Sequence, residues 1–221
     1  MKKIFLSLIV LTIAVSSFAS RPTGLRLGGG FSANFYNSEL ASVIKSALPK
    51  DFNDYSQYYG GFIDVGYDWN LSKHSTICLG GRLNMLFNGE MSKIQNIYTG
   101  QLSNNLFLDV PVLYQFAFNV SSKVQIFIAA GPTANFWLTN GTTFFASSTS
   151  TKKTEGEYVN WFKGNDDLFN RINISLGGQL GVYFSHVKIY AGYDHSMMGY
   201  FNKNIMNSSY GQARLGAAYV F

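Results

Sequence analysis

The chain has 221 residues, with 17 Lys and Arg against 12 Asp and Glu, and it is 47% hydrophobic and 16% aromatic. Cys78 is the only cysteine, which excludes an internal disulfide, and the basic residues form no cluster, so nucleic acid is not an expected partner. After the first nineteen residues no run of eighteen apolar residues occurs, which argues against membrane-spanning helices. Strands remain, because they can carry this hydrophobicity at every second position.

The first nineteen residues have the three parts of a secretory signal. Lys2 and Lys3 precede an apolar run, and Ser17 and Ala19 are small residues at the two positions that a signal peptidase reads. We expect cleavage after Ala19. A retained membrane anchor is the alternative, but the apolar run is short for a span. The mature chain, residues 20–221, is then expected to form one domain.

Strict alternation of apolar with polar or small side chains predicts eight strands. Each is long enough for the roughly nine to eleven residues that a tilted strand needs to cross a bilayer. The strands are expected at residues 25–35, 58–71, 76–87, 106–118, 124–138, 171–184, 187–197 and 210–221.

The expected connections alternate between short and long. Short ones fall at residues 72–75, 119–123 and 185–186, and long ones at 36–57, 88–105, 139–170 and 198–209. Bacterial outer-membrane barrels have short periplasmic turns, long outer loops and both termini in the periplasm. We therefore predict an all-β fold, a closed antiparallel eight-stranded transmembrane up-and-down β-barrel integral to the cell outer membrane. A soluble β-sandwich is the alternative, but that fold does not require short and long connections to alternate.

Aromatic residues fall at both ends of the expected strands, as the two belts of a spanning barrel require. The periplasmic belt is expected to contain Trp69, Phe118, Phe184, Tyr219 and Phe221, and the outer belt Phe35, Tyr36, Phe87, Phe136 and Tyr200. Tyr219 and Phe221 also end the chain on an aromatic carboxyl terminus. We expect this terminal strand to be the assembly signal that the barrel-assembly machinery reads, with outer-membrane lipids as the other partner.

Charged residues occupy the positions expected to face the lumen. They are Arg26, Asp64, Asp68, Arg82, Asp109, Arg171, Asp194 and Arg214. Hairpin pairing places Asp64 and Asp109 on either side of Arg82, and Asp194 beside Arg214. An eight-stranded barrel is just wide enough for side chains to fill it, so these charges are expected to compensate one another in a plugged lumen together with Phe62, Phe127, Trp137 and Tyr190. Inward glycines, among them Gly66 and Gly80, would leave room for the long Arg side chains.

The sequence offers little for catalysis. Asp194-His195-Ser196 has residue types used in acyl transfer, but adjacent side chains on a strand point to opposite faces. His74 and His186 lie in expected turns, where we expect them to be solvated, and the three histidines have no metal-ligand spacing. Asp166-Asp167 is expected to be a solvated pair in a polar loop, with a calcium site as the alternative. We expect no catalytic residues, no cofactor and no resident metal.

The long loops are the remaining place for function. Residues 38–48 could form a short helix, with Ser38 as its cap and Pro49 after it, which rests on the membrane, covers the mouth or packs on its own loops. Residues 140–165 are rich in Ser, Thr and Lys and end in Tyr158, Trp161 and Phe162. Such a loop suits contact with a surface partner, or folds back on the rim.

The segment Leu106-Phe-Leu-Asp-Val-Pro-Val-Leu-Tyr resembles a motif of the PorT-like outer-membrane β-barrel family. Gly131-Pro132, residues 177–181 and the terminal residues 215–221 are also similar to that family, and Tyr193-Asp194-His195-Ser196 departs from it. The resemblance implies an integral outer-membrane protein of Gram-negative bacteria, usually without a defined biochemical activity and in some relatives required for secretion and gliding. It carries over no catalytic residue. We expect Pro111 to lie at a bulge or a locally broken ladder.

Our leading hypothesis is a non-enzymatic barrel whose outer loops mediate surface interaction or whose body supports the envelope. An accessory role in PorT-like protein secretion is the second hypothesis, and a lipid-modifying barrel enzyme is the third. A diffusion pore is the fourth, and a plugged lumen argues against it.

Overall fold

The computed structural model describes residues 23–38, 57–94, 97–148, 154–163, 170–198 and 208–221. They form nine strands: β1 (Gly24–Ser38), β2 (Gln57–Asn70), β3 (Ser75–Ile94), β4 (Ile97–Asn119), β5 (Val124–Ser148), β6 (Thr154–Asn160), β7 (Ile172–Phe184), β8 (Val187–Ser196) and β9 (Ser208–Val220). None of the described segments is a helix long and apolar enough to cross a membrane.

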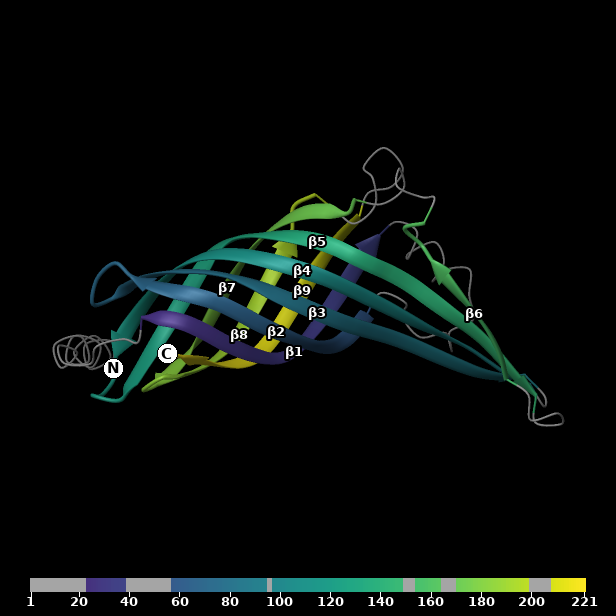
Figure 1. Ribbon diagram of the computed structural model, residues 1–221, viewed down its shortest axis with the longest axis horizontal. Coiled ribbons are helices and arrows are strands. Elements are labelled where there is room, and N and C mark those ends of the chain that lie inside the picture. The colour runs from purple at the N-terminus through teal and green to yellow at the C-terminus, as the bar shows by residue number, and fades with distance from the viewer. Residues whose placement is uncertain (1–22, 39–56, 95–96, 149–153, 164–169, 199–207) are drawn as a thin grey trace, which may run out of the picture.

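Eight of the strands close into an antiparallel ring (Figure 1). β1 pairs with β9 and β2, consecutive strands pair onward to β5, and β5 pairs with β7, which leads through β8 back to β9. β6 pairs with β5 beside this ring. The predicted all-β, eight-stranded up-and-down barrel is confirmed. Closure leaves the ring without an unpaired strand edge, which is the condition for placing strands in hydrocarbon.

Side chains alternate between the inside and the outside of the ring, as the sequence period predicts. In β7, Asn173, Ser175, Gln179 and Tyr183 are buried, whereas Ile172, Ile174, Leu176 and Leu180 are exposed. The usual arrangement of a water-soluble protein is thus inverted. Polar residues fill the interior, and apolar residues cover the surface.

Short connections join the strands at one end of the barrel. Val120 N donates to Val124 O at 2.9 Å across the β4–β5 turn. The β7–β8 connection has two residues, and Ser185 takes the left-handed φ of 57° that such tight hairpins use. Phe221 N donates to Leu25 O at 2.9 Å, so β9 ends where β1 begins, at the same end as the short turns.

The expected long connections at residues 88–105 and 139–170 are corrected. β3 and β4 remain paired out to Ile94↔Ile97, β5 continues to Ser148, and β6 adds a further strand to it. These parts of β3–β6 form a sheet that extends well beyond the ring (Figure 1). We call it the projecting sheet. Its sequence is rich in Asn, Gly, Ser and Thr, so the apolar alternation that marks a lipid-facing strand is absent there.

Pro111 lies where the ladder is locally broken, one of the two alternatives expected, and not at a bulge. Leu79↔Val112 and Arg82↔Asp109 have the same strand offset, but the two residue pairs between them, which include Pro111, are missing from the β3–β4 ladder. The register shift lies between Leu106 and Phe107, opposite β5. It separates the ring from the projecting sheet.

Several predictions fall outside the described residues. They are the signal peptide at residues 1–19, the helix expected after Ser38, the Asp166-Asp167 pair and the outer-belt residue Tyr200.

Candidate functional site

The outer surface of the ring is a broad apolar belt. Phe31 on β1 is 76% exposed, Leu180 on β7 is 65% exposed and Ile63 on β2 is 63% exposed. Soluble monomers rarely expose contiguous apolar patches of this kind. The belt is the surface expected of a barrel that spans a lipid bilayer.

Aromatic residues flank this belt. At the short-turn end the exposed rings are those of Trp69, Phe118, Phe184, Tyr219 and Phe221. At the other end Phe35 and Phe87 are exposed, and Phe136 is half-buried. Tyr36 is a correction, because its ring turns inward and lies 5.4 Å from the Tyr58 ring and 5.8 Å from the Tyr210 ring.

The interior holds balanced charge. Among the described residues the buried cations are Arg26, Arg82, Lys188 and Arg214, and the buried anions are Asp64, Asp68, Asp109 and Asp194. Seven of these eight were predicted. Arg171 is a correction, since it is exposed rather than buried among these charges. Lys188 takes its place in the charge balance.

One ion cluster lies toward the short-turn end. Arg26 donates from Nε to Asp64 Oδ2 at 2.9 Å and also pairs with Asp68. Lys188 Nζ lies 3.9 Å from Asp68 Oδ2 and donates to Gln115 Oε1 at 2.8 Å. The Tyr183 hydroxyl donates to Asp68 Oδ2 at 3.1 Å, which joins β7 to β2 across the lumen.

A second cluster occupies the middle of the barrel. Arg82 is the cross-strand partner of both Asp64 and Asp109, as hairpin pairing predicts. Asp109 accepts hydrogen bonds from Asn84 Nδ2 at 3.0 Å and Asn135 Nδ2 at 2.6 Å. The Arg82 Nη1 atom lies 3.7 Å from Asp109 Oδ2. Two strands, β3 and β5, therefore contribute directly to the surroundings of the Asp109 carboxylate on β4.

The same cluster continues through β9. Arg214 pairs with Asp194 and donates to Gln212 Oε1 at 2.7 Å. Gln212 Nε2 in turn donates to Asn84 Oδ1 at 3.0 Å. Because β9 and β3 are not neighbours in the ring, this bond bridges the lumen.

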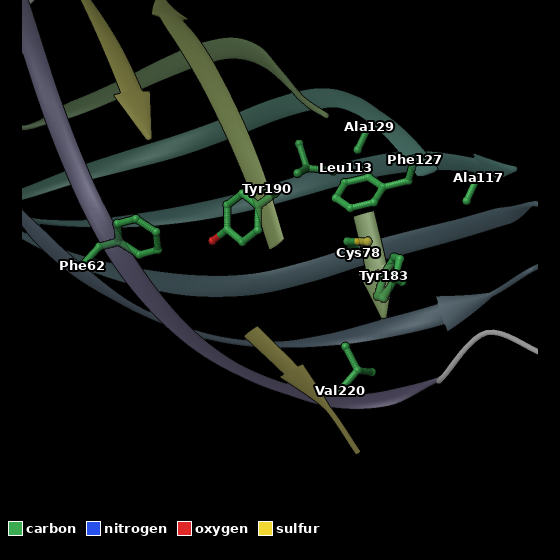
Figure 2. Packing of buried hydrophobic residues seen from close by; sticks show 9 residues of the cluster. All are labelled: Phe62, Cys78, Leu113, Ala117, Phe127, Ala129, Tyr183, Tyr190 and Val220. Carbon is green, nitrogen blue, oxygen red and sulfur yellow. The ribbon is translucent and has the colours of Figure 1, made fainter. Parts of the chain in front are cut away.

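Aromatic rings pack beside the charges. Figure 2 shows one buried cluster, which contains Phe62, Cys78, Leu113, Ala117, Phe127, Ala129, Tyr183, Tyr190 and Val220. Lys188 Nζ lies 4.6 Å from the centroid of the Phe127 ring, a cation–π arrangement. The long side chains thus share the lumen with rings.

A second aromatic cluster fills the end of the lumen from which the projecting sheet extends. We call it the mouth plug: Leu86, Phe107, Trp137, Phe162 and Tyr210, with Tyr36 and Tyr58 packed against it. Phe162 comes from the turn after β6, whereas the others come from the barrel wall. The Arg171 Nη2 atom donates to Phe162 O at 2.9 Å, and Trp161 Nε1 donates to Thr142 Oγ1 at 2.8 Å.

Inward glycines provide part of the space that the long side chains use. A Cβ atom on Gly66 would overlap Arg26 Nη2, and one on Gly80 would come within 2.9 Å of the same atom. This agrees with the expected role of these two glycines. Gly30 serves a different purpose, because its added Cβ would meet the backbone of β9.

The structure separates the three residues considered for acyl transfer. Asp194 and Ser196 are buried in the lumen, and His195 is exposed on the opposite face. Ser196 Oγ accepts a hydrogen bond from Tyr210 N at 2.9 Å. His74 and His186 are not simply solvated, since each ring Nδ1 bonds a backbone oxygen, that of Ala117 at 3.0 Å and that of Val220 at 2.8 Å.

Lys188 and Phe162 are among the interior residues that were not predicted as such, as are Asn84 and Asn135. The sequence could have identified Lys188, because the period of two on β8 places it on the same inward face as Tyr190 and Asp194. Periodicity could not have identified Phe162, since it lies in a turn rather than a strand of the ring.

Solved structures with similarity to this chain are bacterial surface and outer-membrane proteins. The attachment invasion locus protein Ail of Yersinia pestis is 14% identical over 90% of this chain and 99% of its own, with a TM-score of 0.39. Neisserial surface protein A is 15% identical over 90% and 97% (TM-score 0.42), and the outer membrane protein OprG from Pseudomonas aeruginosa is 10% identical over 93% and 99% (TM-score 0.40). No family model and no curated protein matches the chain, so the PorT-like resemblance is not confirmed.

Proposed function

We propose that the protein is a non-enzymatic integral outer-membrane barrel that displays the projecting sheet outside the cell to bind a surface partner. The observation that carries this proposal is the continuation of β3, β4 and β5 past the apolar belt, where β6 widens them into a four-stranded sheet. A barrel that only had to cross the membrane would need no such extension. Both termini would lie in the periplasm, with lipids around the belt.

The projecting sheet has the side chains that contact surfaces use. Leu102, Phe144 and Tyr158 are 46%, 42% and 52% exposed, although they lie beyond the belt. Polar residues such as Thr143 and Asn160 are close to them in the same strands. Apolar and aromatic side chains exposed among hydrogen-bonding groups are typical of binding surfaces.

The filled lumen favours this role over that of a diffusion pore. Side-chain bonds such as Gln212–Asn84 and Tyr183–Asp68 cross the interior, and the mouth plug lies above them. A solute would have to break these contacts to pass. The filled lumen therefore favours binding at the outer surface over passage of a solute through the barrel.

Cysteine labelling tests the location and orientation. Cys78 is 2% exposed, so the wild-type chain should show little reaction with a membrane-impermeant maleimide. Leu102→Cys lies on the projecting sheet, and Ser121→Cys lies in an exposed turn at the opposite end. In intact cells we expect Leu102→Cys to react and Ser121→Cys to react only after permeabilisation. The reverse pattern would mean the opposite orientation.

Shortening the β3–β4 hairpin, which forms part of the projecting sheet, tests the binding role. Residues 89–102 can be replaced by a two-residue Asn-Gly turn, because Asn88 and Ser103 are register partners. Cells with the trimmed barrel should insert it normally but lose adhesion to immobilised glycans, matrix proteins or other cells. Unchanged adhesion at equal surface level would contradict the proposal. If cells that lack the whole protein become sensitive to detergent, and cells with the shortened hairpin do not, the result would instead favour a role in supporting the envelope.

An accessory role in protein secretion is the second candidate, and the similarity of residues 106–114 to the PorT-like motif favours it. Deletion should then deplete secreted proteins from the medium, with the trimmed barrel as the comparison. The lipid-modifying enzyme has less support, because His195 and Ser196 lie on opposite faces. That hypothesis requires the protein to change the structure of lipid A in cells, and requires this change to be lost in the Ser196→Ala or His195→Ala variant.

A further inference from the structure

Several polar atoms in the middle of the lumen have no protein hydrogen-bond partner. They include Arg82 Nε and Nη1, Asp64 Oδ1 and the Tyr190 hydroxyl, all shielded from solvent. A buried guanidinium with two unbonded donor nitrogens is costly, by about 1–3 kcal/mol for each unsatisfied group. Native proteins satisfy such groups with protein atoms or with ordered water.

These groups are neighbours. Asp64 and Arg82 face each other as register partners on β2 and β3. The Arg82 guanidinium carbon lies 5.3 Å from the centroid of the Phe62 ring, and that ring lies 6.4 Å from the Tyr190 ring. Figure 2 shows the Tyr190 hydroxyl directed toward Phe62. A Cβ atom on Gly216 would approach both the Phe62 ring and the Tyr190 hydroxyl, so the two side chains meet above one glycine.

The neighbouring protein groups are already engaged. The other Asp64 oxygen accepts from Arg26 Nε at 2.9 Å, and the two Asp109 oxygens accept from Asn84 and Asn135. At 3.7 Å, Arg82 Nη1 is too far from Asp109 Oδ2 for a hydrogen bond. Arg82 is therefore held near two carboxylates without a close hydrogen bond from Nε or Nη1 to either.

We propose that this part of the lumen is an internal hydration site, in which bound water connects Arg82, Asp64 and Tyr190. The chemistry matches water, because Arg82 supplies two donors, Asp64 an acceptor and Tyr190 a hydroxyl that does both. A water molecule can accept two such bonds and donate two. Arg82 disfavours a metal cation here, and Asp64 and Asp109 disfavour an anion. The site is independent of the proposed function.

The hydration would be enclosed. The mouth plug lies between the site and the outside, and it is built of apolar and aromatic side chains. Water held there exchanges slowly compared with surface water, because its escape requires the plug or the ion clusters to open. The lumen would then be wet at its centre and closed at its outer end.

Water-to-side-chain cross-relaxation in NMR spectra of the wild-type barrel in lipid nanodiscs tests the site. We expect the Arg82 Nε–H signal to show a cross-peak with water whose sign indicates long-lived contact. Arg26 Nε–H is the internal control, because it bonds Asp64 directly and should show no such peak. The two signals are assigned by their loss in Arg82→Lys and Arg26→Lys.

Tyr190→Phe then removes one water partner while keeping the ring. The Arg82 cross-peak should weaken by several-fold, and the Arg26 signal should not change. An Arg82 Nε–H with no water cross-peak in the wild-type barrel would overturn the proposal, whatever the variants do. A peak of equal strength at Arg26 would overturn it as well, because general solvent penetration would then explain both.

Discussion

The Arg171 guanidinium holds Phe162 at the mouth of the barrel, where its carbon lies 5.0 Å from the centroid of the Phe162 ring. The same side chain donates a 2.9 Å hydrogen bond to Phe162 O. Phe162 is 3% exposed, although it comes from a turn outside the ring. An exposed cation thus contributes to holding a loop residue in the mouth plug.

Arg171→Ala should release this turn. Loss of the charged hydrogen bond and the cation–π contact costs about 2 kcal/mol, which corresponds to a roughly tenfold or greater rise in the open population. Cleavage by trypsin after the exposed Lys163 should accelerate accordingly, while the unfolding temperature of the barrel changes little. Arg171→Lys, which keeps the charge without the planar group, should be intermediate. An unchanged cleavage rate would show that other contacts hold the turn.

Lys188→Met should destabilise the barrel by up to about 3–5 kcal/mol, because four buried carboxylates would then face three buried cations among the described residues, with Arg26 the remaining cation beside Asp68. The midpoint of urea unfolding in lipid vesicles, followed by gel mobility, measures the change. Adding Asp68→Asn restores the balance between the buried charges, so the double variant should recover part of the loss. If the double variant were as unstable as the sum of the two single variants, charge balance would not be the cause.

The ring is predictable from the sequence because lipid and lumen impose opposite chemistry on alternate residues. The pairing of Asp64, Arg82 and Asp109 follows from the same alternation, combined with the positions of the short turns. This reasoning fails where strands carry no apolar alternation, so the sequence predicts a loop at residues 88–105 where the strands in fact continue. Arg171 was misplaced because its position continues the β7 alternation, but β7 begins one residue later, at Ile172. Phe162 depends on a tertiary contact that no local pattern encodes.

Gly66→Ala should destabilise the barrel by about 1–3 kcal/mol, since the new methyl group would overlap Leu79 O as well as the Arg26 side chain. Gly81→Ala is a matched control on the lipid side. Its nearest neighbour would be Leu108 Cδ1 at 3.7 Å, an ordinary contact, so stability should change little. The two unfolding temperatures, measured by boiled and unboiled gel mobility, should therefore differ. Equal values would argue that the lumen adapts to the added methyl group.

Leu180→Arg and Leu102→Arg test where the membrane lies. Both leucines are exposed, at 65% and 46%, but Leu180 belongs to the apolar belt and Leu102 to the projecting sheet. An arginine on the lipid face of a barrel costs up to about 2–4 kcal/mol. Leu180→Arg should therefore lower the yield of folding into lipid vesicles, while Leu102→Arg should fold like the wild-type chain. Equal tolerance of both arginines would contradict the assignment of the belt.

Deleting Phe221 should reduce insertion without altering export. Its ring is 60% exposed in the aromatic belt at the short-turn end, and its backbone N–H donates to Leu25 O at the seam where β9 meets β1. The deletion removes both the terminal aromatic and this seam bond, so assembly of the closed ring should slow. Phe184→Ala removes an exposed aromatic of the same belt away from the terminus and serves as the control.

We expect the deleted chain to accumulate in the periplasm with its signal cleaved, and the Phe184 variant to reach the outer-membrane fraction as a heat-modifiable band. Normal insertion of the deleted chain would mean that the terminal aromatic is not the assembly signal.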